Sequence, residues 1–226
     1  MKNHYTENVD KHHLSRGADR IDSSGYRSRM KLGVIAFFCL LSIVGNLATS
    51  FLASALHAPI FLDTVFTVAI TFYAGLVPGL IVAVLHNPIR TFIRSVIYGT
   101  SLFYFGSLYA LCGMLIALST WILSRNKKDF FFNRTVTVLY LLIIVFVSSF
   151  LSCFSASALD TFIRPLLNDS LRFFPTDIFS IPFQKLKFGM FLSYLLPRIP
   201  ITVLDRLICT FSGFGLYRLV ERRTAC

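Results

Sequence analysis

Long apolar runs alternate with short polar or basic segments along most of this 226-residue chain. The pattern predicts six membrane spans, because a helix needs about 20 apolar residues to cross a bilayer. The second run is short, and a Gly-x-x-Pro-Gly turn at 75–79 joins it to the third. If both runs cross the membrane, the entry and exit of this helical hairpin return to the same face. The predicted spans are 32–56, 61–74, 76–93, 102–123, 135–159 and 200–219.

The segments outside the spans differ in length and character. Residues 1–31 are polar and mixed in charge, which predicts a disordered tail, and 221–226 form a short C-terminal tail. The longest connection, 160–199, contains an apolar patch at 188–196. We interpret this patch as an external lid or interfacial helix, although it could instead extend the last span outward. The predicted fold is an all-α membrane protein, a six-transmembrane-helix bundle over 32–220 with a long external connection between helices 5 and 6.

Composition supports the membrane class. Hydrophobic residues make up 55% of the chain and charged residues 15%, whereas a soluble domain has about 25% charged residues. The net charge of +11 does not indicate nucleic-acid binding, because the basic residues collect between the apolar runs. Seven, four and three of the 22 Lys and Arg residues lie in 1–31, in 125–134 and after 217. The positive-inside rule therefore predicts a multi-pass protein of the inner (cell) membrane with both termini cytoplasmic.

Polar side chains gather at both ends of the predicted hairpin. Asp63 lies at its entry, and His86, Asn87, Arg90 and Arg94 lie at its exit. Residues 86, 90 and 94 are spaced by four and share one helix face. One interpretation is a ligand site in which the arginines contact an anionic group. The other is structural, with Asp63 as a helix N-cap and the arginines extending to the membrane surface.

Two further charged pairs lie at or inside the apolar runs. Asp205 and Arg206 are adjacent within the last run, so they need partners in the bundle or a polar cavity. Asp160 and Arg164 are four residues apart after the fifth run, which favours a local ion pair. The residues that we predict to bind a ligand are Asp63, His86, Asn87, Arg90, Asp205 and Arg206.

The first span has small residues on one face. Gly45, Thr49 and Ala53 follow one another at four-residue spacing, and Ala48 is a further small residue of this span. Small residues let helix backbones approach closely in lipid. The face is therefore either a docking surface for another membrane protein or a packing surface inside the bundle, and the spacing leaves both open.

No motif predicts an enzyme. The chain has no Walker sequence, no H-E-x-x-H and no G-x-S-x-G. The five cysteines have no metal-ligand spacing, and four of them fall inside apolar runs. We therefore predict no catalytic residues, no metal and no cofactor.

Four segments together resemble a known family. They are F-L-D-T-V-F-T-V at 61–68, G-L-V-P-G-L at 75–80, H-N at 86–87 and I-P-I-T-V-L-D-R at 199–206. With them, the chain resembles the substrate-binding S components of energy-coupling factor (ECF) vitamin transporters. It also looks like the related membrane sensor regions of some bacterial histidine kinases.

The resemblance implies a bacterial inner-membrane subunit that binds a vitamin-like solute from outside. Such a subunit docks through its first helix on a membrane coupling subunit driven by an ATPase pair. It implies that Asp63, Asn87 and Asp205 lie near the binding pocket. The alternatives are a ligand-sensing membrane module with a separate signalling partner, or an integral-membrane lipid-modifying enzyme. The residues that the resemblance assigns to docking are Ala48, Thr49 and Ala53.

Overall fold

The computed structural model describes residues 32–56, 60–99, 103–163, 165–167, 182–183 and 189–224, and these ranges contain helices and no strand. The predicted N-terminal tail and residues 225–226 lie outside the described residues. The chain divides into two compact units, 1–37 and 38–226, and every contact below lies within the second.

The helices confirm an all-α, multi-pass membrane protein. In the described part of the chain, five are long and apolar enough to cross a membrane: Leu32–Ala55, Leu76–Ile97, Gly106–Ser124, Arg134–Ile163 and Met190–Arg223. In order, the elements are α2 (Leu32–Ala55), α3 (Val65–Ala74), α4 (Leu76–Tyr98), α5 (Phe103–Leu108), α6 (Ala110–Ser124), α7 (Lys127–Phe130), α8 (Arg134–Ala158), a π-helical turn η3 (Leu159–Ile163), a 3₁₀ turn η4 (Pro165–Leu167) and α10 (Met190–Thr224).

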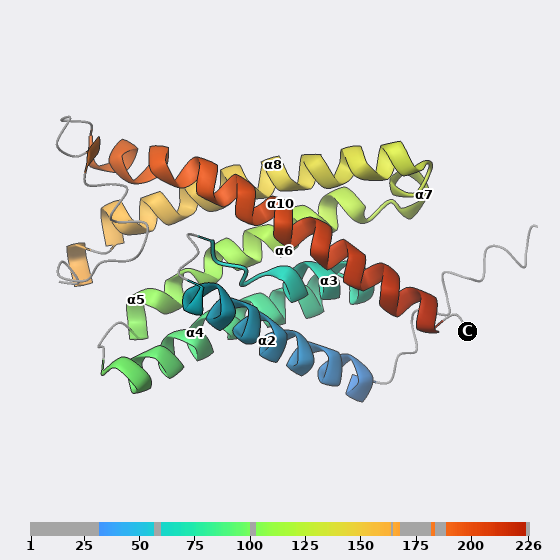
Figure 1. Ribbon diagram of the computed structural model, residues 1–226, viewed down its shortest axis with the longest axis horizontal. Coiled ribbons are helices and arrows are strands. Elements are labelled where there is room, and N and C mark those ends of the chain that lie inside the picture. Colours follow the sequence, from blue (N-terminus) through green and yellow to red (C-terminus); the bar gives the residue numbers. More distant parts are fainter. Residues whose placement is uncertain are drawn as a thin grey trace, which may run out of the picture. The chain divides into compact units, whose positions relative to one another are not determined.

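The last helix is longer than predicted. The run at 200–219 is part of α10, which has 35 residues and includes Pro197 and Pro200. The interpretation of 188–196 as a lid is therefore wrong for its residues from 190 onward, which extend the span. The extension packs beside α8 (Figure 1), where the rings of Phe191 and Phe154 lie 5.4 Å apart.

The predicted hairpin is present, with a shorter first arm. The helix α3 has ten residues, and Gly75 alone separates it from α4. Gly75 has φ of 95° and ψ of −167°, a conformation almost confined to glycine. The close approach of the arms needs Gly79, because a Cβ there would lie 2.1 Å from the Thr71 hydroxyl. The chain thus reverses direction within one residue.

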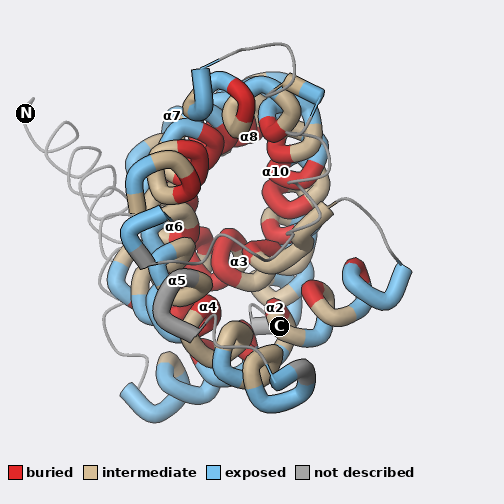
Figure 2. The backbone as a smooth tube through the Cα atoms, turned by 90° about the vertical axis from the view of Figure 1, so that its left-hand side faces the viewer, coloured by how far each residue is buried: buried red, intermediate tan, exposed pale blue. Residues whose placement is uncertain are grey.

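The short helix α3 is surrounded by longer ones, since it packs against α4, α6 and α10. Its approach to α10 depends on Gly213, where a Cβ would lie 2.7 Å from the carbonyl oxygen of Val65. Figure 2 shows buried residues on the faces that α3, α6, α8 and α10 turn toward one another. A ten-residue helix that cannot span a bilayer alone is thereby enclosed by protein.

An aromatic core surrounds the C-terminal part of α3. Lys127 of α7 donates a hydrogen bond to the Phe72 carbonyl, at 3.2 Å, and so satisfies a carbonyl of the last turn of α3. Its ammonium also lies 5.1 Å from the centroid of the Tyr217 ring. The region around the C-terminal part of α3 is therefore packed with apolar and aromatic side chains. The cluster comprises Val68, Phe72, Ile116, Phe130, Leu141, Ile144 and Tyr217.

Candidate functional site

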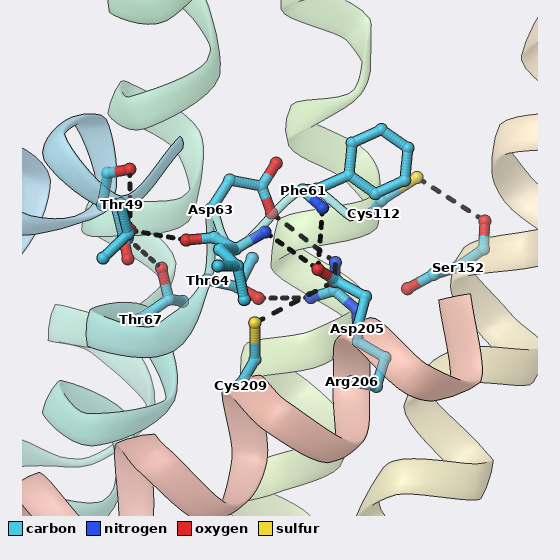
Figure 3. A network of polar contacts seen from close by, with 12 residues as sticks. Thr49, Phe61, Asp63, Thr64, Thr67, Cys112, Ser152, Asp205, Arg206 and Cys209 are labelled. Carbon is cyan, nitrogen blue, oxygen red and sulfur yellow. Dashed lines mark hydrogen bonds and ion pairs between the residues drawn. The ribbon is translucent and has the colours of Figure 1, made fainter. Parts of the chain in front are cut away.

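The site is built around the non-helical segment 60–64, which leads into α3 (Figure 3). Asp205 of α10 accepts hydrogen bonds from the backbone N–H groups of Phe61 and Leu62, both at 2.8 Å to Oδ1. On the other side, the Thr49 hydroxyl of α2 donates to the Leu62 carbonyl at 2.5 Å. Leu62 has φ of 45°, which is uncommon for a non-glycine residue. Side chains from two helices thus supply the hydrogen-bond partners that the backbone groups of this irregular segment need inside a membrane protein.

The first turn of α3 is capped from α2. Asn46 accepts a hydrogen bond from the Phe66 N–H at 2.9 Å and donates one to the Thr67 hydroxyl at 2.8 Å. The N-cap position itself is Thr64, whose side chain makes no capping bond. The interpretation of Asp63 as the N-cap is therefore wrong, because Asp63 lies one residue earlier and its carboxylate has other partners.

Those partners are two arginines. Arg90 of α4 lies 3.3 Å from Asp63 Oδ2, and Arg206 lies 3.5 Å from Asp63 Oδ1 and 2.7 Å from Asp205 Oδ2. Arg206 also donates to the Thr64 hydroxyl. The four charged side chains are between 0% and 17% exposed and have no net formal charge. The structure therefore brings together four of the six predicted ligand-binding residues, from three separate segments.

The remaining two predicted residues, His86 and Asn87, are buried in α4, with exposed fractions of 1% and 8%. His86 lies within electrostatic range of Asp63. Neither of its ring nitrogens has a hydrogen-bond partner among the described residues. A buried imidazole without such a partner costs free energy, so it is a candidate for contact with a bound molecule.

The predicted docking face of α2 is engaged inside the protein. A Cβ at Gly45 would lie 2.7 Å from the Phe66 ring, Thr49 bonds to the 60–64 segment, and Ala53 is 2% exposed. Ala48 is exposed. Of the two interpretations left open by the spacing, these contacts favour internal packing for Gly45, Thr49 and Ala53. A partner that docks on this helix would meet the side on which Ala48 lies.

Paired substitutions on α2 test this assignment. Ala53→Leu is expected to lower the free energy of unfolding by about 1–3 kcal/mol, because it overpacks a buried position. Ala48→Leu adds the same volume on the exposed side and is expected to change stability by no more than about 0.5 kcal/mol. Thermal unfolding of the purified variants in detergent gives the comparison. Equal stability of the two variants would show that the face of Ala53 is not packed internally.

The structure adds a buried cluster that the sequence analysis missed. Arg198 of α10 lies 2.7 Å from Asp160 Oδ2, and the Tyr109 hydroxyl donates to Asp160 Oδ1 at 2.5 Å. The predicted local partner of Asp160, Arg164, lies outside the described residues. A signal was present in the sequence, because Arg198 lies between Pro197 and Pro200 in an apolar run. An arginine in such a place needs a buried acid.

Both clusters combine ion pairs with hydrogen bonds. Each of their carboxylates is paired with an arginine. Within the described ranges, no group of three or more His, Cys, Asp or Glu side chains could hold a metal ion. Comparisons with protein-family models, curated proteins and solved structures found no match.

Proposed function

We propose that this chain is the substrate-binding membrane subunit of an ECF-type importer for a vitamin-like small molecule. The observation that supports it most is the buried, charge-balanced network of Asp63, Arg90, Asp205 and Arg206, with His86 beside it. Buried ion pairs cost more to desolvate than hydrophobic packing, so a network of this size favours a functional role over a purely stabilising one.

The difference between the two ends of α3 supports binding from one side of the membrane. The charged network surrounds the segment before α3, whereas the aromatic core surrounds the C-terminal part of α3. In the proposed topology, α3 and the 60–64 segment together form the second of six spans, and both termini are cytoplasmic. The charged network then faces outside, and the aromatic core and the basic 125–134 segment face the cytoplasm.

The proposed partners are a membrane coupling subunit and its ATPase pair, since no nucleotide-binding motif of this chain could supply energy for import. The exposed side of α2 is the proposed docking surface. Ala48 lies there, and Val44 and Leu52 at four-residue spacing on either side are 55% and 56% exposed. A small residue flanked by apolar ones allows close helix approach in lipid.

Mass spectrometry of small molecules that co-purify with the protein tests the function. The wild-type protein, purified from bacterial membranes, is expected to retain a compound that mock purifications lack. Asn87→Ala is expected to weaken its binding by about 1–3 kcal/mol, the cost of an unmatched buried polar group. Asn133→Ala, at an exposed asparagine before α8, is the matched control and is expected to bind like wild type.

Absence of any bound compound from the wild-type protein would contradict the proposal. Binding without co-purification of a coupling subunit from the native membrane would favour the ligand-sensing alternative.

A further inference from the structure

The Tyr109–Asp160–Arg198 cluster lies where the chain departs from regular helix geometry. Asp160 is in the π-helical turn η3, and Arg198 lies between the two prolines of α10. A π turn and helix-interior prolines each weaken the local hydrogen-bond ladder, and such departures concentrate at functional sites. Here they coincide with a buried ion pair whose side chains are 7% and 1% exposed.

Unpartnered hydroxyl groups occur next to this ion pair. Ser157, three residues before Asp160, is 0% exposed, and Thr161 follows Asp160 directly. The buried hydroxyl oxygens of both residues have no hydrogen-bond partner within the described part of the chain. Buried hydroxyls are ordinarily paired, so these two are available to a bound molecule.

The helix α10 connects this cluster with the Asp63 network. Arg198 and Arg206 are eight residues apart on it, which corresponds to about 12 Å along the helix axis. Between the two clusters, α6 and α8 approach each other closely, since the Cys112 thiol of α6 lies 3.8 Å from the Ser152 carbonyl of α8 (Figure 3). The two clusters are therefore neighbours along one helix.

The available groups limit the chemistry of a ligand. Both oxygens of Asp160 are engaged, one by Tyr109 and the other by Arg198. The pair has no net charge, and neither does the Asp63 network. A charged ligand end would remain uncompensated in this low-dielectric interior. Uncharged hydroxyl or carbonyl oxygens, in contrast, match the hydroxyls of Ser157 and Thr161.

We infer that Tyr109, Asp160 and Arg198, with the hydroxyls of Ser157 and Thr161, form a second contact region of the ligand site. This region takes an uncharged end of the ligand that bears hydroxyl or carbonyl oxygens, while the other end meets His86 and the Asp63 network. The inference rests on the proposed function and extends its site from α4 and the 60–64 segment to η3 and the N-terminal part of α10.

Two conservative substitutions test the second region, with the compound that co-purifies with wild type as the probe. Tyr109→Phe and Ser157→Ala are each expected to lower the amount retained per protein by about five- to tenfold. The control is Tyr217→Phe, which also removes a tyrosine–carboxylate hydrogen bond, to Glu221 at 2.7 Å, but lies in the aromatic core. It is expected to retain the wild-type amount.

Ser157→Ala keeps the test valid if Tyr109→Phe fails to fold, because removal of an unpartnered hydroxyl breaks no hydrogen bond in the described structure. Its melting temperature is expected to match wild type or exceed it. The inference is overturned if both variants retain the wild-type amount while Asn87→Ala loses it, and the proposed function then stands. If wild type retains no compound, the inference and the proposed function both fail.

Discussion

Arg206→Gln is expected to lower the free energy of unfolding by about 3–5 kcal/mol, the usual cost of breaking a buried ion pair by removing one partner. Arg206 is 6% exposed and contacts both Asp63 and Asp205. Without it, Asp63 keeps Arg90 as an ion-pair partner, whereas Asp205 has no ion-pair partner left among the described residues. The Thr64 hydroxyl also loses its donor. Thermal unfolding in detergent, followed by size-exclusion chromatography, measures the loss.

A second substitution tests whether charge imbalance is the cause. In the Arg206→Gln background, Asp205→Asn is expected to recover part of the stability, because it removes one unpaired charge but keeps an oxygen that can accept from Phe61 and Leu62. Arg222→Gln, at an exposed position of the same helix, is the matched control and is expected to be nearly neutral. A double variant less stable than Arg206→Gln alone would contradict the electrostatic explanation.

Two buried polar residues are expected to respond in opposite directions when each is replaced by leucine. His86→Leu is expected to leave thermal stability unchanged or raise it, because neither ring nitrogen has a hydrogen-bond partner among the described residues. Asn46→Leu is expected to lower the free energy of unfolding by about 1–3 kcal/mol, because it leaves the Phe66 N–H and the Thr67 hydroxyl unpaired.

The same two variants are expected to differ in the opposite sense in the amount of ligand that they retain. His86→Leu is expected to reduce the retained compound by about tenfold or more, as in sites where polar groups are kept for function at a cost in stability. A folded fraction of Asn46→Leu is expected to retain it. Destabilisation of His86→Leu as large as that of Asn46→Leu, with ligand retained, would assign His86 a structural role.

The hairpin illustrates what local pattern can predict. Apolar runs on either side of a Gly-x-x-Pro-Gly turn imply antiparallel arms, and they return the entry, with Asp63, and the exit, with Arg90, to the same side of the hairpin, where the structure shows an ion pair between these two residues. Both inferences depend on helix rise and chain connectivity alone. The start of α3 was less predictable, because the residues at 60–64 are apolar enough to continue a helix, and only bonds from α2 and α10 stabilise their irregular conformation.

The sequence by itself determined the membrane class, the approximate position of five spans, the hairpin and the need of Asp205 and Arg206 for buried partners. These follow from hydrophobicity, helix periodicity and the cost of charge in an apolar medium, which act along one segment at a time. Only the tertiary structure decided that Asp205 supports the backbone before α3, that Asp160 pairs with Arg198, and that Ala53 is buried within the protein. Such choices depend on which helix faces meet, because a buried charge has several candidate partners and helix packing selects among them.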